Sequence, residues 1–565
     1  MERRWQIRKV NEAYLRRLTE ELSLPPVAAR ILLNRGITAP EEGRRFLHPS
    51  LKVLDALFDL PGLSEAVSCV EQALREGVQI LVFGDYDADG LAASAILVRF
   101  LRRLAANVAV YIPSRFVEGY GLTQEAARRI IAEWSVPLLV ITVDCGIRDV
   151  TGARLLKERG ARLVILDHHF PDPSSLPEAD ALVSTWDFGG TMVSFLSGAG
   201  LALLFVRALA LRLGLSQDPA EEYLDFACLG TIGDVVPLLR ENRAIVKYGL
   251  KMLNENPSLP MRALCEAAGI AGRSVDTEEV GFILVPRVNA AGRVAHPKIA
   301  LDLLLSDHPG EALAYARCLN RLNSRRQEEE ERVLMDILGD PEKRLLLEDA
   351  VVVLSGKGWN IGVLGIVASR LSENLGRPVI VLGEHNGIAI GSGRSIEGFH
   401  LLKALEECSP LLLRFGGHEM AVGLRIHAEH VPSLRKRLNE RFSRTIRECL
   451  AFRGLVVDAL VGLRDLDERF LSFWERLKPF GEKNPNPLLA TLNVVLERRW
   501  TWGRGRNHLR LLLRQGKEYQ EAVVFEGKGR EEELYGGSLA DFAFEVQNGA
   551  ENSFYLKVHD WRVKK

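Results

Sequence analysis

The feature that most constrains the fold is a series of short apolar segments that alternate with helix-like segments between residues 79 and 166. The apolar, β-branched segments are 79–84, 108–112, 138–143 and 161–166, and helical spacing marks the stretches between them. Strands that are apolar along their whole length are buried on both faces, as in a parallel sheet covered by helices. The pattern therefore predicts an α/β domain built on a parallel sheet.

The rest of the chain repeats the α/β pattern once and then changes to short strands. Residues 198–340 have mostly helical spacing and end in a long polar helix at 319–338, whose charges we expect to face water. An α/β unit follows from residue 350, and five or more short strands occupy about the last 110 residues. Such a density of short strands favours a small barrel such as an OB-fold.

We therefore predict a multidomain α/β protein in five parts. A helical segment at 1–50 precedes a domain with a parallel sheet at 51–318. A connector helix at 319–345 leads to a second α/β domain at 346–450, and an OB-like β-barrel follows at 451–565. A chain of 565 residues has room for about three or four domains of ordinary size.

Charge and cysteine content limit the classes of protein that fit. With 73 Lys and Arg against 74 Asp and Glu, any surface that binds nucleic acid must be local and balanced by acidic groups elsewhere. The seven cysteines form no C-x-x-C pair, which is typical of reduced thiols in a cytosolic protein. The N-terminus is charged and the longest apolar runs are too short to cross a bilayer. We expect a cytoplasmic protein without a membrane partner.

Acidic and histidine residues gather where three of the predicted strands end. They are Asp85, Asp87 and Asp89 after the first strand, Asp144 after the third, and Asp167, His168 and His169 after the fourth. Because the carboxyl ends of parallel strands face one crevice, the three clusters should converge in space. Each cluster alone could be a turn or a helix cap, but their coincidence at three strand ends predicts a metal site.

Two divalent cations would relieve the repulsion among such closely spaced carboxylates. A pair of ions about 3.5–4 Å apart also clamps a phosphate for in-line hydrolysis. Because imidazole beside carboxylates shifts the preference toward transition ions, we expect Mn²⁺ to be preferred and Mg²⁺ to be accepted. A further acid, Asp234, lies in a predicted loop between helices and is placed to close the site.

These residues stand within motifs that resemble those of the DHH phosphoesterase superfamily. The four ordered motifs are DYDADG (85–90), VDCG (143–146), DHH (167–169) and GTIGD (230–234). The second half resembles the DHHA1 substrate domain through GWNIGVLGIVASRL (358–371), GSGRS (391–395) and FGGHEMAVGL (415–424). Segments similar to those of the RecJ exonucleases are YIPSRFVEGYGL (111–122), RVNAAGRVAHP (287–297) and PFGEKNPNP (479–487). The resemblance covers essentially the whole chain.

The resemblance implies a single-stranded-DNA-specific 5′→3′ exonuclease that uses two divalent cations in DNA repair and recombination. By motif, the metal ligands would be Asp87, Asp89, Asp144, His168 and Asp234, with Asp144 bridging both ions. The catalytic set would be Asp144, Asp167 and His169, of which His169 would contact the scissile phosphate or assist proton transfer. Asp167 would orient an imidazole through a hydrogen bond, and Asp85 would support the site without contacting metal.

The resemblance also implies residues that contact DNA. They are Arg115, Arg287, Asn289, Arg293, Asn360, Ser392, Arg394, Gly416, Gly417 and His418. Ser392 and Arg394 would hold phosphates near the 5′ end, and the Gly-Gly-His loop would approach the strand closely. In structural terms alone, an arginine near acids can be an ion-pair partner and Gly-Gly-His can be a hairpin turn. Asn360 stands where the family has histidine, so we expect an altered contact there and retained activity.

A basic, aromatic segment lies in the predicted barrel. Residues 498–514, RRWTWGRGRNHLRLLLR, contain six arginines, two tryptophans and no acid. Arginines that meet phosphates and rings that stack on bases are typical of surfaces that bind single strands. We expect Arg504, Arg506 and Arg510 to bind DNA; the alternative is a basic hairpin whose tryptophans fill the core.

Two other functions fit part of the pattern. A DHH phosphodiesterase for short oligonucleotides or cyclic dinucleotides would share the metal motifs, but the N-terminal extension and the barrel argue against it. A non-catalytic DHH scaffold of a replication complex should have lost metal ligands, whereas all of those proposed are present. For the nuclease, the family implies single-stranded DNA as substrate, and single-strand-binding protein and a helicase as partners.

Overall fold

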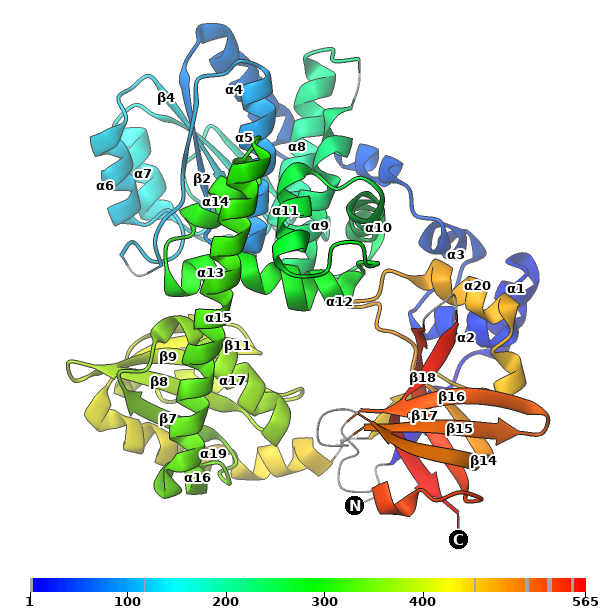
Figure 1. Cartoon of the computed structure of the whole chain (residues 1–565). Helices are drawn as coiled ribbons and strands as arrows, with labels where there is room; N and C mark the ends of the chain where they lie inside the picture. The colour runs from blue at the N-terminus through cyan, green and yellow to red at the C-terminus, as the bar shows by residue number, and fades with distance from the viewer. Residues whose placement is uncertain are drawn as a thin grey trace.

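The computed structural model describes residues 4–564 except 116, 188, 217, 452–453, 503–507, 526–530 and 550–552. Two α/β domains and a β-barrel follow one another around a ring, in which the first helices of the chain lie beside the barrel (Figure 1). The predicted α/β class is confirmed, with its parallel sheet, second α/β domain and C-terminal barrel. Among the described residues no helix is both long enough and apolar enough to span a bilayer.

The first α/β domain is built on a five-stranded sheet in which every pairing is parallel. The strands are β2 (Gln79–Gly84), β3 (Val108–Tyr111), β4 (Leu138–Val143), β5 (Arg162–Asp167) and β6 (Ala181–Ser184). In the order β3-β2-β4-β5-β6, the three strands that end in acidic residues are neighbours. All residues of β4 are buried, because α6 and α7 cover one face of the sheet and α4, α5 and α8 cover the other (Figure 1).

The helices of this domain bury the sheet and then form a helical layer toward the connector. They are α4 (Leu63–Glu76), α5 (Ala88–Arg103), α6 (Gln124–Glu133), α7 (Val150–Glu158), α8 (Gly198–Arg212), α9 (Leu224–Gly233), α10 (Arg240–Glu255), α11 (Leu259–Ala267), α12 (Thr277–Glu279), α13 (Val285–Val294) and α14 (Lys298–Leu305), with the short turns η2 (Pro219–Tyr223) and η3 (Val280–Leu284). α5 is buried along almost its whole length, since it lies between the sheet and the pair α8 and α9.

One long helix, α15 (Pro309–Gly339), connects the two α/β domains, and α16 (Pro341–Leu346) follows it. It begins ten residues before the predicted 319–338, because Pro309 stands in its first turn, where proline is tolerated. The expectation that its charges all face water is wrong for Arg326 and Glu330, which are only 9% and 8% exposed. Both lie where the helix passes from one domain to the other.

The second α/β domain has a mixed sheet in the order β10-β11-β9-β8-β7, in which only β7 and β8 pair in parallel. Its elements are β7 (Val352–Lys357), α17 (Ile361–Leu375), β8 (Val379–His385), β9 (Ile388–Arg394), α18 (Leu401–Glu406), η4 (Ser409–Leu411), β10 (Leu412–Gly417), β11 (Ala421–His427), η5 (Ala428–His430) and α19 (Val431–Ala451). α15 and α17 pack on one face of this sheet, and α18 and α19 pack on the other.

The C-terminal unit is a barrel in the order β13-β14-β15-β16-β18-β17, closed by the pairing of β14 with β17. Its elements are β12 (Leu455–Val457), β13 (Ala459–Leu460), η6 (Leu463–Asp465), α20 (Glu468–Leu477), β14 (Leu489–Trp502), β15 (His508–Gln515), β16 (Glu518–Val524), η7 (Glu531–Glu533), β17 (Leu539–Asn548) and β18 (Phe554–Val563). Irregular registers along β14 bend this strand, which lets it pair with both β15 and β17.

The N-terminal helices share a core with this barrel instead of forming one of their own. The elements are β1 (Trp5–Ile7), α1 (Glu12–Glu21), α2 (Pro26–Asn34) and α3 (Pro40–Leu47). The next element, η1 (Leu51–Leu57), packs into the core of the first α/β domain instead. Leu18 and Ile31 belong to the same buried cluster as Phe470 and Phe473 of α20. In addition, β1 pairs in parallel with β12, so the first and last parts of the chain form one folded unit.

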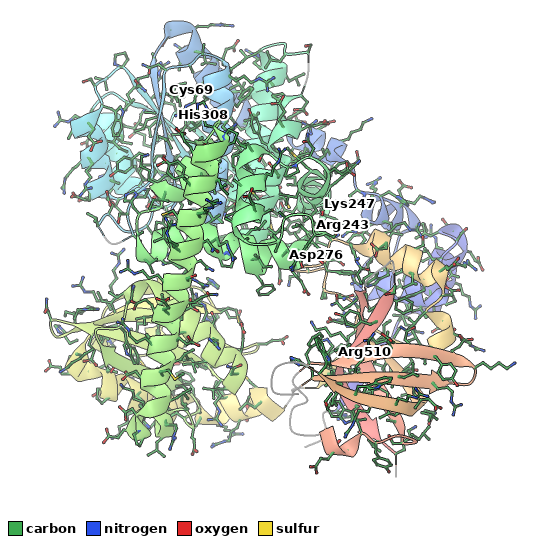
Figure 2. All side chains as sticks on the ribbon, in the orientation of Figure 1. Cys69, Arg243, Lys247, Asp276, His308 and Arg510 are labelled. Carbon is green, nitrogen blue, oxygen red and sulfur yellow. The ribbon has the colours of Figure 1, made fainter. Side chains whose placement is uncertain are left out.

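A fully buried arginine, Arg243 on α10, joins this composite unit to the first domain (Figure 2). Its guanidinium lies 4.1 Å from the ring centre of Phe46. It donates hydrogen bonds to the carbonyl oxygens of Phe46 (2.8 Å), Arg476 (2.9 Å), Lys478 (2.8 Å) and Pro479 (3.3 Å). These carbonyls lie at the carboxyl ends of α3 and α20, where helices lack partners and carry partial negative charge. One side chain therefore caps two helices at the contact between the composite unit and the first domain.

Arg243→Met should loosen the composite unit from the first domain, because four carbonyls, two of them in buried and two in part-buried hydrogen bonds, lose their donor. A hydrogen bond to a charged group contributes about 1.5–3 kcal/mol, and the surroundings of the new side chain can relax in part. We therefore expect the free energy that holds this interface together to fall by on the order of 3–5 kcal/mol. Thermal unfolding and limited proteolysis between the first domain and the barrel would measure it. Lys251→Met, which removes an exposed lysine of the same helix, is the control. Equal melting and cleavage of the two variants would contradict the role of Arg243.

Candidate metal centre and nucleic-acid interface

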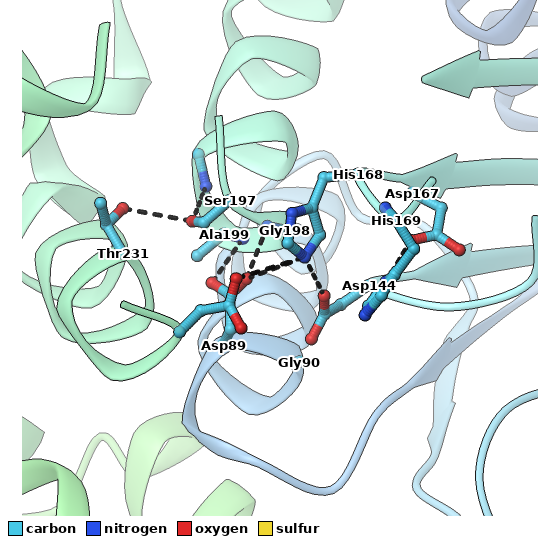
Figure 3. A network of polar contacts seen from close by, with 12 residues as sticks. Asp89, Gly90, Asp144, Asp167, His168, His169, Ser197, Gly198, Ala199 and Thr231 are labelled. Carbon is cyan, nitrogen blue, oxygen red and sulfur yellow. Dashed lines mark hydrogen bonds and ion pairs between the residues drawn. The ribbon is translucent and has the colours of Figure 1, made fainter. Parts of the chain in front are cut away.

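The carboxyl ends of β2, β4 and β5 bring the predicted acidic and histidine residues together (Figure 3). β4 runs directly into Asp144, and β5 ends at Asp167, just before the two histidines. Asp234 joins them as the residue that caps the carboxyl end of α9. The convergence follows from the strand order, because side chains at adjacent carboxyl ends of parallel strands face the same crevice.

Helix caps hold the turn after β2. Asp87 is the N-cap of α5 and accepts hydrogen bonds from the backbone N–H groups of Asp89 and Gly90, at 3.0 and 3.1 Å. Asn289 of α13, a predicted DNA contact, accepts a hydrogen bond from the N–H of Ala88 at 2.8 Å. The side-chain oxygen of Asn289 thus stabilises the turn that carries the candidate ligands.

Asp89 is oriented by the start of α8. Its two carboxylate oxygens accept hydrogen bonds from the N–H groups of Gly198 (2.6 Å) and Ala199 (2.9 Å) (Figure 3). A helix start favours a carboxylate in this position, because its N–H groups lack helical partners. Glycine is required at residue 198, since a Cβ atom there would lie 2.6 Å from the Cβ of Asp144.

The imidazole of His168 lies at the focus of three carboxylates. Its Nε2 is 3.0 Å from Oδ1 of Asp144, 3.5 Å from Oδ2 of Asp234 and 3.9 Å from Oδ2 of Asp89. Among the described residues, neither this Nε2 nor Oδ1 of Asp144 has a hydrogen-bond partner, although both are buried. Buried polar atoms are ordinarily satisfied, so atoms that converge without a partner fit a bound cation. Ligand atoms of Asp89, His168 and Asp234 lie within 4.8 Å of one another.

A second group of candidate ligands adjoins the first. Ligand atoms of Asp85, Asp87 and Asp144 also lie within 4.8 Å of one another, and Oδ1 of Asp85 is buried without a partner among the described residues. Asp85, which was expected only to support the site, is therefore a candidate ligand as well. Asp144 belongs to this group and contacts His168 of the other, which is the position of a bridging ligand. Its backbone is left-handed (φ 61°), a strained conformation common at functional sites.

Burial and mutual repulsion shift the pKa values of several groups in this cluster. Burial raises the pKa of Asp89 to about 6, and the charge of Asp87 adds to this. Burial and neighbouring carboxylates also raise the pKa values of Asp85, Asp144 and Asp234 well above the ordinary range. Burial lowers the pKa of His168 to about 3, so its imidazole is neutral and can bind metal. Two divalent cations would supply the positive charge that this donor set lacks.

His169 is held at both ring nitrogens. Nδ1 lies 2.8 Å from Oδ1 of Asp167, and Nε2 lies 3.0 Å from the hydroxyl oxygen of Tyr120. The other oxygen of Asp167 accepts a hydrogen bond from the N–H of Ile147 at 3.0 Å. Burial opposes charge on both partners, but their attraction prevails, lowering the pKa of Asp167 to about 2 and raising that of His169 to about 9. Asp167 therefore orients this imidazole, and Tyr120 is a contact that the sequence patterns did not single out.

The three arginines predicted to contact DNA in the first domain contact different parts of the structure. Arg115 places its guanidinium 4.4 Å from the ring centre of Tyr86, inside the turn after β2. Arg293 donates a hydrogen bond to the carbonyl of Gly362 in α17, at 3.2 Å. Arg287 donates to a side chain of α15 at 3.0 Å. Arg293 thus links the first domain to the second, whereas Arg115 contacts the turn after β2 and Arg287 contacts the connector helix.

In the second domain, the predicted contacts surround the start of α17. Asn360 is its N-cap and accepts a hydrogen bond from the N–H of Gly362 at 2.9 Å. Ser392 and Arg394, on β9, face the first turns of the helix: a Cβ at Gly365 would lie 3.3 Å from Nη2 of Arg394 and 3.5 Å from Oγ of Ser392. A guanidinium, a hydroxyl and a helix start side by side form a surface suited to an anion.

The Gly-Gly-His motif forms the β10–β11 hairpin beside this surface. Gly417 has a φ of 138°, and a Cβ there would lie 2.2 Å from the carbonyl oxygen of Ala421, so only glycine fits. The space above Gly416 is open for 4 Å. Burial lowers the pKa of His418, and so does the charge of Arg394. The motif is thus a hairpin, as the structural alternative expected, and its close approach to the DNA strand stays a prediction.

On the barrel, the tryptophans of the basic segment are surface residues. Trp500 and Trp502 at the end of β14 are 45% and 47% exposed, which rules out the alternative that they fill the core. Together with Phe525 and Tyr555 they line a hollow of about 760 Å³. Aromatic rings around an open hollow suit the stacking of unpaired bases.

The arginines of that segment are only partly placed. Arg510 also lines the hollow, but it forms an ion pair with Glu521 at 2.6 Å. Arg504 and Arg506 lie outside the described residues. The charge of Arg510 is balanced by Glu521, so aromatic rings are the main groups that the described part of the hollow offers to a DNA strand.

Comparison with known proteins agrees with this arrangement. The chain matches the DHH family, N-terminal domain over residues 79–231, the DHHA1 domain over 348–444 and the RecJ OB domain over 457–555. The crystal structure of RecJ in complex with Mn²⁺ from Thermus thermophilus superposes with a TM-score of 0.82 at 33% identity, covering 100% of this chain and 80% of that one. Its complex with Mg²⁺ gives a TM-score of 0.76 at 32% identity, with 100% and 79% covered.

Fold and site together define a phosphoesterase of the DHH type. Two curated relatives, each described as a single-stranded-DNA-specific exonuclease RecJ, narrow the assignment. The protein from Bacillus subtilis is 36% identical over 565 residues, which is 100% of this chain and 69% of the relative. The protein from Thermus thermophilus is 38% identical over 517 residues, or 90% and 72%. The chain belongs to the RecJ family of single-stranded-DNA-specific exonucleases.

The raised pKa values predict how stability depends on pH. With its pKa raised to about 9, His169 keeps a proton in the folded protein between about pH 6.5 and 9 that the unfolded chain has already lost. The raised pKa values of Asp85, Asp144 and Asp234 act in the same direction. Stability of protein treated with EDTA should therefore fall as pH rises through this window. Saturating Mn²⁺ should reduce or reverse that slope, because the ion displaces the protons. Melting temperatures at four pH values with and without Mn²⁺ test this, and parallel curves would contradict a cation site.

Proposed function

We propose that this exonuclease degrades single-stranded DNA from the 5′ end with two divalent cations, Mn²⁺ preferred and Mg²⁺ accepted. The observation that carries the proposal is the convergence of carboxylates on Nε2 of His168, with Asp144 between two groups of candidate ligands. We assign the cations to Asp87, Asp89, Asp144, His168 and Asp234, and add Asp85. Bound there, the cations would activate the attacking water and stabilise the negative charge of the phosphate in the transition state.

The remaining residues of the centre position the substrate. The side chain of His169, oriented by Asp167, is 40% exposed, so its Nε2 can donate to a phosphate oxygen or to the leaving oxygen. The hydroxyl oxygen of Tyr120 lies 3.0 Å from that nitrogen. Binding of a strand therefore exchanges one hydrogen bond of His169 for another.

The proposed direction of degradation rests on the second domain. Ser392, Arg394 and the start of α17 form an anion-binding surface on the far side of the domain junction from the metal centre. A terminal 5′-phosphate held there would place the first phosphodiester bond toward the metal centre. Asn360 caps α17. Its amide stands where the family has histidine and can still hydrogen-bond a phosphate or sugar of the strand.

The rest of the strand would run toward the barrel. The hollow around Trp500 and Trp502 offers rings for stacking and would hold bases several nucleotides from the cleaved bond. This second contact argues against an enzyme for short oligonucleotides or cyclic dinucleotides, which need no such surface. The unpartnered ligand atoms at the metal centre argue against a non-catalytic scaffold.

We also propose a setting for the reaction. A nuclease for single strands depends on unwound DNA, so a helicase and single-strand-binding protein are the partners we infer, in repair and recombination. All seven cysteines are free thiols, which suits the reducing cytoplasm.

Asp144→Asn should abolish hydrolysis, because it removes the charge shared by the two ligand groups. We expect kcat to fall by about 10³-fold or more, which corresponds to roughly 4 kcal/mol of transition-state stabilisation. The assay follows 5′- and 3′-labelled single strands, long and short, with Mn²⁺ or EDTA, and counts bound metal. Asp225→Asn, at a buried aspartate away from the centre, is the control. Near-normal turnover by Asp144→Asn would contradict the two-metal assignment. If the unmodified enzyme released the 3′ label first, the proposed 5′→3′ direction would be wrong.

Replacing Trp500 and Trp502 together with alanine should weaken binding of long strands, because two stacking platforms are lost. At about 1–3 kcal/mol per stacked base, we expect the Kd to rise at least tenfold. Hydrolysis of oligonucleotides too short to reach the barrel should be unchanged. The matched control is Tyr519→Ala, an exposed aromatic residue of the same barrel outside the hollow. If long and short substrates were affected alike, the hollow would not be a strand-binding surface.

A further inference from the structure

Two arginines lie side by side on the open face of the second α/β sheet. Arg414 on β10 and Arg425 on β11 are directly opposite each other in the antiparallel pairing, and both residues are exposed. Neither forms a hydrogen bond or an ion pair with any residue that the structure describes. Like charges at directly opposed positions repel each other and destabilise a sheet. Sheet stability therefore does not explain this pair.

The positions around the pair offer no negative charge. On its other side, Arg425 pairs with Ile390 of β9. Two residues along the strands, the same face carries Gly416 and Gly423 toward the hairpin and His427 toward the other end. Among the described residues of the sheet, no acidic side chain therefore adjoins the two arginines on this face. Their charges are left for an anion from outside the sheet.

Two glycines lie between the arginines and the surface proposed for the terminal phosphate. Gly423 pairs with Gly416 on one side and with Ser392 on the other, so these three residues form one row across three strands. A Cβ atom at Gly416 or Gly423 would meet no described atom within 4 Å, so the space above both is open. Arg414 and Arg425 form the next row on the same face, about 7 Å away at the usual rise of a strand. An arginine side chain can span that distance.

The order of these groups matches a short chain of phosphates. Ser392 and Arg394 border the first turns of α17, where the phosphate on the first nucleotide is proposed to bind. A second phosphate would lie over the glycines, where a ligand can approach the backbone closely. A further phosphate would meet Arg414 and Arg425, whose planar forks match phosphate oxygens. A register shift of β10 just before Arg414 is a bulge, which commonly redirects side chains beside functional sites.

We propose that Arg414 and Arg425 bind the outer phosphates of a DNA strand that ends in a 5′-diphosphate or a 5′-triphosphate. The inference rests on the proposed function, in which Ser392 and Arg394 hold the phosphate of the first nucleotide. It extends the substrates to strands with polyphosphorylated 5′ ends. The two arginines repel each other in the free protein, and the outer phosphates remove that repulsion when they bind.

The site affects only the first nucleotide that is released. Water attacks the phosphorus of the first phosphodiester bond. The bond from this phosphorus to the 3′ oxygen of the first nucleotide breaks, and that oxygen takes the proton that the water gives up. The first product is then a nucleoside 5′-triphosphate with a free 3′ hydroxyl, and the shortened strand keeps a 5′-monophosphate. Every later cut starts from a 5′-monophosphate and does not use Arg414 or Arg425.

The test uses the full chain and twelve-nucleotide thymidine strands that end in a 5′-monophosphate or a 5′-triphosphate. The variant combines Arg414→Gln with Arg425→Gln. The control combines Arg437→Gln with Arg447→Gln, which removes two exposed arginines of α19 on the opposite face of the sheet. The first product released in Mn²⁺ and the melting temperature without DNA are measured for each protein. The Kd for each strand is measured by fluorescence anisotropy with Asp144→Asn added to stop hydrolysis.

The unmodified chain should release thymidine 5′-triphosphate first from the triphosphorylated strand and should bind that strand more tightly than the monophosphorylated one. In the Arg414 and Arg425 variant, the Kd for the triphosphorylated strand should rise about tenfold or more, because two charge-assisted contacts are lost. The Kd for the monophosphorylated strand should stay within about twofold. The melting temperature should not fall, because the charges removed repel each other. The control should match the unmodified chain.

An equal rise in the Kd for both strands would mean that the arginines contact internal phosphates, and it would overturn the inference. An unchanged Kd for the triphosphorylated strand would overturn it as well, as would a first product other than thymidine 5′-triphosphate from an enzyme that starts at the 5′ end. If the unmodified chain instead released nucleotides from the 3′ end, the proposed function would fail. The Kd values for the two strands would still decide whether Arg414 and Arg425 bind the outer phosphates.

Discussion

The architecture of this exonuclease depends on keeping several carboxylates close enough to repel one another. Asp89, Asp144 and Asp234 surround one neutral imidazole nitrogen, and burial makes their charges costly in the absence of a cation. The parallel sheet supplies the crowding, because three neighbouring strands end at the same edge. The left-handed backbone of Asp144 and the glycine at 198 then permit the approach. Much of the first domain can be understood as a scaffold that holds an electrostatically unfavourable cluster in readiness for metal.

The convergence of acidic and histidine residues could be predicted from the sequence, because it depends on the order and direction of the strands. Apolar strands followed by acidic residues can be read from residue types alone, and parallel topology fixes which ends meet. The two ligand groups, including the part taken by Asp85, depend on distances that no linear pattern contains. Tyr120 was missed for a similar reason: its hydroxyl reaches His169 from a loop 49 residues away in sequence. The hydrogen bond from the N–H of Ala88 to the side-chain oxygen of Asn289 could not be predicted either, whereas the DNA contact expected for Asn289 stays a prediction.

The connector and the termini show where periodicity misleads. A run rich in Arg and Glu is usually a solvated face, yet Arg326 and Glu330 are buried because α15 is covered by a different domain at each end. Likewise, the helices at the start of the chain show an ordinary amphipathic pattern. This pattern predicts that an apolar face of each helix is buried, but it does not identify the element that buries it. Their partner is the barrel formed by the last residues of the chain. Long-range pairing of this kind is fixed by shape and by single residues such as Arg243, and neither leaves a local signature.

That shared core has a consequence for how the protein is made. The apolar faces of α1–α3 emerge from the ribosome first, but the barrel strands that cover them are synthesised roughly 400 residues later. At about 5–20 residues per second, the helices wait on the order of 20–80 s with their apolar faces uncovered. During that time the first α/β domain can fold by itself, whereas the N-terminal helices depend on chaperones or on weak contacts with that domain. A chain that stops before the barrel is complete leaves them without a partner, so premature termination should yield aggregation instead of a smaller working nuclease.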